Sequence, residues 1–402
     1  MVCLILTGYL GANSHIRQNT LFSVIFIVLA GLSETQNDSY DLNTTDKTTN
    51  FTRPEYQAGI TKTRVAMVAV GLSAIFVTDP SNMSWLTVYD GWSFYVHQRG
   101  VLTMKGEPIW WGRAMVVVGA GRTVFMNDSD NIRGYDDSFA QNPKHPMQEL
   151  AILLEANRLD HARIGVEMDN YYYTDAAHAS LTTNLSHETF EDATGHVNWQ
   201  CTVKSPQEIT YMRHAAYIVE TRRVRIVEIA QPGLRKNNLI TGIYATDIRG
   251  TDRRWGDYPT ILPVAPSGMG AIAPHLTWDG RLMEKGEVTF FEITGAHRRY
   301  QYSQSRTLFL GDDPTKYQNA EAAVLDAIDA GLEQAKLGNQ AQNITNAFNV
   351  VLSKADFEKK ERCGYAICIS YPPDWGKRTI SFRASDKTGL EAATIFNFMP
   401  AL

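Results

Sequence analysis

The sequence has few cysteines, and none of them stands in a pattern that binds metal or indicates a disulfide framework. Its 402 residues contain only Cys3, Cys201, Cys363 and Cys368, with no Cys-x-x-Cys pair. Cys363 and Cys368 flank an apolar stretch, so we expect both to be small core residues. The scarcity of cysteine favours a reducing compartment.

The chain also lacks a strong excess of either charge. Its 38 basic and 43 acidic residues leave a formal net charge of -5, which gives no electrostatic reason to expect a nucleic acid or an anionic membrane surface as a partner. A hydrophobic fraction of 44% and a charged fraction of 20% are typical of a soluble globular protein. The length is sufficient for two domains.

Residues 21–32, LFSVIFIVLAGL, form an apolar run that is too short to span a bilayer but long enough for the core of a signal peptide. The polar stretch that follows is predicted to be disordered. It carries Asn-x-Ser/Thr triplets at Asn37, Asn43 and Asn50. We therefore expect residues 1–53 to be an N-terminal extension, either a signal or anchor or an untypical start ahead of a cytoplasmic enzyme.

Residues 54–200 alternate between strand and helix patterns, which predicts an α/β domain. Helices are expected in PEYQAGITKTRVAMVAVGL and HPMQELAILLEANRL, and after Asp79, which precedes Pro80 as a helix-start signal. Strands are expected in the segments SAIFVTD, EPIWWGR, RTVFM and RIGVEM.

Residues 201–402 predict an α+β domain. Ser205 and Glu208 form a capping box, and Pro206 suits the first helical position, so a long helix begins there. Further helices are expected in LRKNNLITGIYATDIRG, PTKYQNAEAAVLDAIDAGLEQAKLG and QNITNAFNVVLSKADF, laid over an antiparallel-leaning sheet.

Residues 286–311, GEVTFFEITGAHRRYQYSQSRTLFLG, read as a strand, a short turn and a second strand. Glu292 is the one carboxylate inside the apolar first strand, and strand alternation places Val288, Phe290 and Glu292 on one face. On these residues alone, Glu292 is either a functional group or a structural carboxylate paired with one of the arginines Arg298, Arg299 and Arg306.

The order of these segments resembles the creatinase/aminopeptidase, or pita-bread, superfamily, and residues 54–402 resemble the ectoine hydrolase family within it. The motifs that carry the resemblance are VTDPSNMSWLTVYDGWSFYVHQ, IGVEMDNYYY, DYPTILPVAPSG, APHLTWDGR, FFEITGAHRRY and SYPPDWGKRTISFR. The resemblance implies an α/β N-terminal creatinase-like domain followed by an α+β pita-bread catalytic domain. It also implies a cytoplasmic homodimer that opens the cyclic amidine of ectoine, a small zwitterion, to an N-acetyl-diaminobutyrate.

The resemblance places two of the superfamily's metal-ligand positions on Glu292 and Ser303, and two others near Tyr365 and Met399. One carboxylate cannot supply the several oxygen or imidazole donors that divalent cations need, so we predict a site with no metal and no cofactor. Two departures from the family are Gln301 and Ser303, where histidine and proline are expected. The chain also ends at FNFMPAL, where family members continue, so we expect a truncated C-terminus.

The resemblance implies that Glu292 attacks the amidine carbon or activates water for the attack, and that His275 carries the proton to the leaving nitrogen. Trp85, Tyr89 and Trp92 are expected as lid residues over a partner's site. Tyr365 and Asp374 are expected to contact the substrate, and His97 to help hold a carboxylate. Without the resemblance, the histidines are surface residues, the aromatic residues are core, and Asp374 belongs to a turn.

Two other functions remain open at this point. One is a creatinase-like amidinohydrolase acting on a linear guanidino compound, against which SYPPDWG argues. The other is a non-catalytic pita-bread binding module. The sequence also leaves ectoine and hydroxyectoine equally open as substrates, because small local changes can accommodate one hydroxyl.

Overall fold

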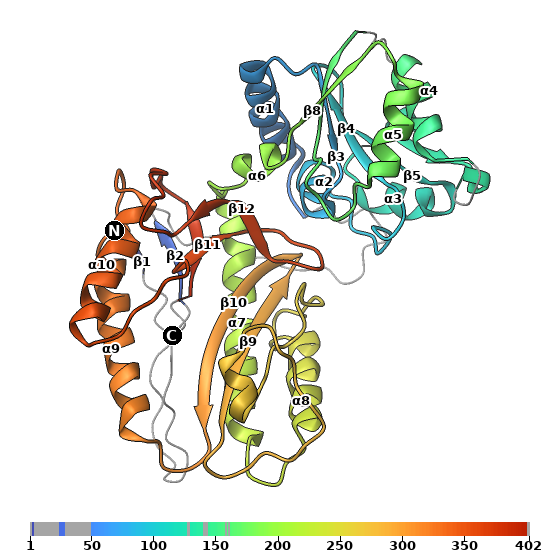
Figure 1. Cartoon of the computed structure of the whole chain (residues 1–402). Coiled ribbons are helices and arrows are strands. Elements are labelled where there is room, and N and C mark those ends of the chain that lie inside the picture. Colours follow the sequence, from blue (N-terminus) through green and yellow to red (C-terminus); the bar gives the residue numbers. More distant parts are fainter. Residues whose placement is uncertain are drawn as a thin grey trace. The chain divides into compact units, whose positions relative to one another are not determined.

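The computed structural model describes residues 2–3, 24–28, 50–126, 129–139, 144–156, 159 and 161–399. The chain divides into two compact units (Figure 1). We call Thr35–Cys201 the first domain, and Met1–Glu34 together with Thr202–Leu402 the second domain.

The first domain contains a six-stranded mixed sheet in the order β6-β5-β4-β3-β7-β8. Its strands are β3 (Ala74–Val77), β4 (Arg99–Thr103), β5 (Ile109–Arg113), β6 (Ile132–Tyr135), β7 (Arg163–Val166) and β8 (Thr189–Asp192). Its helices are α1 (Arg53–Val70), α2 (Pro80–Thr87), α3 (Val117–Thr123), α4 (Met147–Ala156), α5 (Asp175–Asn184) and α6 (His196–Gln200).

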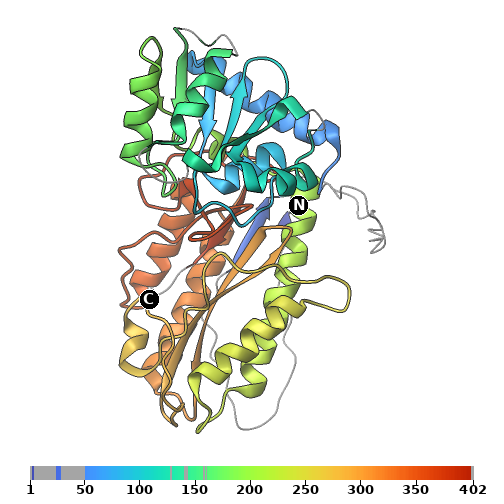
Figure 2. The ribbon, with the colours of Figure 1, turned by 90° about the vertical axis from the view of Figure 1, so that its right-hand side faces the viewer.

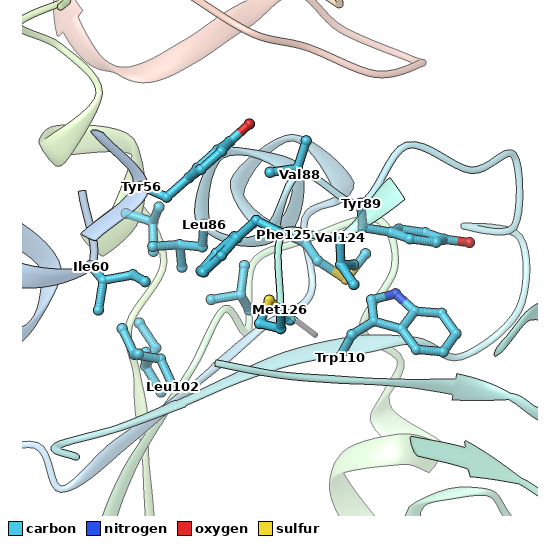
Figure 3. Packing of buried hydrophobic residues seen from close by; sticks show 14 of the residues in the cluster. Tyr56, Ile60, Leu86, Val88, Tyr89, Leu102, Trp110, Val124, Phe125 and Met126 are labelled. Carbon is cyan, nitrogen blue, oxygen red and sulfur yellow. The ribbon is translucent and has the colours of Figure 1, made fainter. Parts of the chain in front are cut away.

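Helices cover both faces of this sheet, because alternate residues of a strand point to opposite sides. Ile75 and Val77 of β3 belong to a core cluster formed with α1, α2 and α3, part of which Figure 3 shows. Ala74 and Phe76 of the same strand belong to a second cluster, formed with α4 and α5. The predicted α/β architecture of the first domain is therefore confirmed.

The strand predicted over residues 122–126, RTVFM, is wrong. Helix α3 ends at Thr123, and Val124 to Met126 continue as an irregular buried segment. The ring of Phe125 stacks on Tyr56 of α1, with 4.9 Å between centroids. A short apolar run indicates burial, but tertiary packing decides whether it pairs in a sheet.

The longest helix of the second domain is α7 (Pro206–Ile229), whose predicted capping box is confirmed. The Ser205 hydroxyl accepts a hydrogen bond from the backbone N–H of Glu208, and the Glu208 carboxylate accepts one from the backbone N–H of Ser205. The other Glu208 oxygen accepts a hydrogen bond of 3.0 Å from the Tyr300 hydroxyl. The helix start is thereby joined to strand β10 (Tyr300–Phe309).

The other predicted helices of this domain also form. They are α8 (Lys236–Arg249), α9 (Thr315–Leu332) and α10 (Ala341–Lys354). The predicted hairpin consists of β9 (Val288–His297) and β10, in antiparallel pairing. A second sheet has the order β1-β2-β13-β11-β12, with β1 (Val2–Cys3), β2 (Val24–Val28), β11 (Gly364–Ile367), β12 (Gly376–Ser381) and β13 (Ile395–Phe398).

The apolar run of residues 21–32, expected as the core of a signal or anchor, contributes strand β2, which pairs antiparallel with β13. Asn37 and Asn43 lie outside the described residues. In the part of the chain that the structure describes, no helix is long and apolar enough to cross a membrane.

Helix α7 lies directly against one face of the β9–β10 hairpin, as Figures 1 and 2 show. The close approach requires glycine at position 295, where a Cβ atom would lie 2.1 Å from the carbonyl oxygen of Ala215. The buried Arg222 of α7 donates a hydrogen bond to the backbone carbonyl of Thr294 and pairs with Asp247 at 3.3 Å. Helix α7 therefore packs against one face of the hairpin and stabilises it.

We predict that Gly295→Ala lowers the free energy of unfolding by about 2–3 kcal/mol, because the methyl group collides with the helix backbone. Gly280→Ala is the matched control, since a Cβ atom at position 280 meets nothing within 4 Å. Urea unfolding followed by circular dichroism measures both variants. Equal stability of the two would show that the hairpin and α7 are not in this contact.

Candidate active site

Glu292 lies in the middle of β9, on the face of the hairpin opposite to α7. The turn between the strands is made by Arg298 and Arg299, which both have positive φ angles, 52° and 66°. This turn fixes a register in which Glu292 lies opposite Ser305, and Thr294 lies opposite Ser303. The side chains of these residues share one face, which we call the Glu292 face.

The hydrogen bonds on the edge of β9 that faces away from β10 show which pairs of side chains across the hairpin are closely spaced. The backbone N–H and C=O of Glu292 both bond to Val264, at 2.9 and 3.0 Å. Glu292 and Ser305 therefore form a non-hydrogen-bonded pair across β9 and β10, the kind in which opposing side chains are nearer to each other. Thr294 and Ser303, two residues along each strand, form a pair of the same kind.

The Glu292 carboxylate is buried and has no hydrogen-bond or ion-pair partner in the described part of the chain. Glu292 is 8% exposed. No described residue donates a hydrogen bond to its carboxylate or forms an ion pair with it. Burial raises its pKa to about 7, with a further rise from the charge of Asp374 and an opposing effect of Arg362. A buried charge without a partner is costly and marks a functional site.

The alternative in which Glu292 pairs with an arginine is wrong for the described residues. Arg299 pairs with Asp257 at 3.9 Å, and Arg298 lies over the ring of Tyr211 at 5.9 Å. Arg306 belongs to the α7 face of β10, where its charge interacts with Glu220. None of the three neutralises Glu292.

Tyr365 and Asp374 lie in the electrostatic neighbourhood of Glu292. Burial raises the pKa of the Tyr365 phenol, and the charge of Glu292 raises it further. The phenol oxygen accepts a hydrogen bond of 2.7 Å from the Trp375 indole. Asp374 is exposed, and its carboxylate also accepts a hydrogen bond from the backbone N–H of Gly376. The structure therefore brings together three of the predicted site residues.

Sequence reasoning missed the role of Arg299 in holding this region together. Its guanidinium lies 3.7 Å from the ring centroid of Tyr258 and 5.7 Å from that of Tyr371. Its backbone carbonyl accepts a hydrogen bond from Ser370. The motifs DYPT, HRRY and SYPPDWG, distant in sequence, thus meet at one arginine, and their joint appearance in the resemblance was the available signal.

His275 lies in the loop after a short 3-10 helix, η4 (Gly268–Ile272). The residue is exposed, and no described hydrogen bond or ion pair joins its side chain to Glu292. Its φ of 67° is uncommon for a residue with a side chain. The loop leaves the edge of β9, because Val264 and Ser267 bridge to Glu292 and Thr289.

The aromatic residues of the first domain divide into core and surface. Tyr89 is 2% exposed, and the centroid of its ring lies 4.9 Å from that of the Trp110 ring. Figure 3 shows these two side chains next to each other in the core. Trp85 packs against the same core cluster. Trp92 is 58% exposed and is the one of the three predicted lid residues whose ring faces solvent.

His97 lies beside a buried cation. Its ring stands 4.8 Å from that of His145, and its Nδ1 atom lies 3.3 Å from the Arg99 guanidinium. Burial, then the charge of Arg99, lowers the pKa of His97 to about 4. The imidazole is therefore neutral at neutral pH.

The side chains at the positions matched to metal ligands do not fit a divalent metal ion. The positions matched to metal ligands carry one carboxylate, a hydroxyl at Ser303, a phenol at Tyr365 and a thioether at Met399. Among the described residues, no group of three or more His, Cys, Asp and Glu side chains is arranged to hold a metal. Hard and borderline cations require several such ligands together.

The fold and the position of this site define a class of protein. Residues 60–200 match the family model of the Creatinase/Prolidase N-terminal domain, and residues 210–402 match that of Metallopeptidase family M24. The chain belongs to the creatinase/M24 superfamily of hydrolases, which confirms the predicted order of an α/β creatinase-like domain and a pita-bread domain.

Two proteins of this superfamily are similar in sequence to the chain over most of its length. The chain is 48% identical to the ectoine hydrolase of Halomonas elongata, over 88% of this chain and 90% of that protein. It is 34% identical to an uncharacterised hydrolase/peptidase of Sinorhizobium fredii, over 88% and 90% of the two chains. A prolidase from Thermococcus sibiricus shares the fold, with a TM-score of 0.73 and 16% identity, over 85% of this chain and 89% of that one.

We predict that Glu292→Gln stabilises the protein at alkaline pH. Burial raises the pKa of Glu292 in the folded protein from 4.5 to about 7. The contribution of this residue to the free energy of unfolding is therefore fully present below pH 4.5 and is lost as the pH rises through 7. This pKa shift corresponds to a loss of at most about 3 kcal/mol in the free energy of unfolding.

The difference in unfolding free energy between Glu292→Gln and the natural chain should grow from pH 5 to pH 8, as measured by urea unfolding. Glu287→Gln is the control, because Glu287 pairs with Lys236 at 2.9 Å, and its loss should destabilise the protein instead. A pH-independent difference for the Glu292 variant would contradict the raised pKa.

Proposed function

We propose that this protein is a metal-independent hydrolase that opens the cyclic amidine ring of ectoine or a close analogue, giving an N-acetyl-diaminobutyrate. The observation that carries the proposal is the buried carboxylate of Glu292, which has no partner among the described residues. The 48% identity to an ectoine hydrolase supports the choice of substrate.

A cyclic amidinium suits this carboxylate because it is a planar cation with N–H donors along its N–C–N edge. A charge-assisted hydrogen bond between such a pair is about twice as strong as a neutral one. An arriving cation also lowers the pKa of the buried acid. Substrate binding therefore leaves Glu292 ionised at the moment when a nucleophile or base is needed.

The amidinium carbon is electrophilic without the polarisation that a metal ion would supply. Glu292 either attacks this carbon or takes a proton from the water that does so. The ring C–N bond then breaks, and the leaving nitrogen receives a proton, a step that we assign to His275. Tyr365 and Asp374 contact the bound ring.

The proposal extends to the assembly and its location. We propose a homodimer in which the exposed ring of Trp92 covers the site of the partner subunit. The proposed cytoplasmic location rests on the scarcity of cysteine and on the resemblance to the ectoine hydrolase family.

We predict that the purified protein turns over ectoine and that Glu292→Gln reduces kcat by at least about a thousandfold, because the amide is neither nucleophile nor base. The assay follows the N-acetyl-diaminobutyrate by chromatography. Glu287→Gln is the matched carboxylate control.

Creatine is the second substrate to assay, because it tests the creatinase-like alternative. Turnover of creatine but not ectoine would replace the proposed substrate. Near-normal turnover by Glu292→Gln would reject the role of this residue.

We predict that dialysis against a strong chelator leaves kcat and KM unchanged within about twofold, because the Glu292 face supplies one carboxylate and no imidazole. Metal content is measured by mass spectrometry on the same sample. Loss of activity on chelation, with recovery on adding manganese or zinc, would contradict metal independence.

A further inference from the structure

Two hydroxyl groups beside Glu292 are buried and have no hydrogen-bond partner in the part of the chain that the structure describes. Ser303 is 1% exposed and Ser305 is 6% exposed. Neither Oγ atom makes a hydrogen bond with any described residue. Buried hydroxyl groups in proteins almost always have a partner, so an orphaned pair calls for a ligand or a water molecule.

The strand pairing places both hydroxyls next to the carboxylate. Ser305 lies directly opposite Glu292, and paired Cβ atoms of this kind are separated by about 4.5–5.5 Å. Ser303 is the diagonal neighbour on the same face, still within reach of a shared small ligand. The three polar groups therefore converge on one volume.

Two neighbouring polar side chains on this face already have hydrogen-bond partners. The Thr294 hydroxyl donates to the carbonyl of Gly295 at 3.1 Å. The amide of Gln301 donates to the carbonyl of Arg299 at 3.2 Å. The hydroxyls of Ser303 and Ser305 are therefore the buried side-chain groups of this face that have no hydrogen-bond partner among the described residues.

The chemistry of these groups selects the ligand. A hydroxyl both donates and accepts, whereas a carboxylate only accepts. A water molecule with its two protons and two lone pairs can satisfy all three, and buried waters typically make two to four hydrogen bonds. We propose that Ser303 and Ser305 hold a water molecule beside Glu292, and that this is the water consumed in ring opening.

This inference rests on the proposed function for the fate of the water, and it holds for either route. If Glu292 is the base, the water oxygen bonds to the amidinium carbon, its proton passes to the carboxylate, and the ring C–N bond breaks as nitrogen is protonated. If Glu292 is the nucleophile, ring opening comes first. The water then attacks the carbon of the covalent intermediate, expels the carboxylate and leaves the amide.

We predict that Ser303→Ala and Ser305→Ala each lower kcat by about tenfold or more, because the water loses its orientation. KM should change by less than about twofold, since the substrate ring is held by other groups. Thr307→Ala is the matched control, because Thr307 lies on the same strand and face, opposite Phe290. Its kcat should stay near that of the natural chain.

A crystal structure of the substrate-free protein at high resolution gives a readout that does not depend on turnover. A water molecule within hydrogen-bond distance of both Oγ atoms is expected in the natural chain. It should be missing from the double alanine variant.

The two experiments separate the inference from the proposed function. Absence of this water from the natural chain, or alanine variants with unchanged kcat, would overturn the inference while ectoine turnover stands. A natural chain that holds the water but does not act on ectoine would overturn the proposed function instead. If the alanine variants fail to fold, the presence or absence of the water molecule in the crystal structure of the natural chain tests the inference.

Discussion

The site depends on one unfavourable arrangement, a carboxylate placed in the middle of a buried strand without a counter-ion among the described residues. Removing a charge from water costs several kcal/mol unless a partner replaces the lost hydration. The rest of the second domain must supply the stability that offsets this cost. Helix α7 does so by packing along the hairpin, with Gly295 permitting the close approach and Arg222 tying the helix to the backbone of β9.

The charges around the hairpin are kept away from Glu292 by the period of the strands. Arg306 of β10 faces α7, and Arg299 is occupied by Asp257 and the two tyrosine rings. Since these two arginines have other partners, the acid remains available for a cationic ligand. Under the proposed function, a positively charged substrate takes the place that a metal ion occupies in a metallopeptidase of the same fold. The family model is named for metallopeptidases, but the donor set here lacks the ligands that such an ion requires.

The Arg299 cluster explains how separate sequence motifs act as one unit. The turn between β9 and β10 presents this arginine to Tyr258 and Tyr371, and its carbonyl holds the start of the loop that carries Asp374 and Trp375. The indole of Trp375 in turn binds the phenol of Tyr365. A series of contacts therefore connects the hairpin turn to the residues around the Glu292 carboxylate. A change in one motif would alter the positions of the others.

Features that depend on residues close together in the chain could be predicted from the sequence. The capping box at Ser205, the hairpin around residues 298–299 and the α/β alternation of the first domain follow from local hydrogen bonding and side-chain period. The same period placed Glu292 and Phe290 on one face, and the resemblance singled out Glu292, Tyr365 and Asp374. Tertiary structure alone decided that Val124 to Met126 are not a strand, that β2 pairs with β13, and that Tyr89 lies in a core. It also decided that Arg298, Arg299 and Arg306 do not pair with Glu292 and that Ser303 and Ser305 have no hydrogen-bond partner among the described residues. These properties arise from contacts between residues far apart in the chain, whose partners no local pattern specifies.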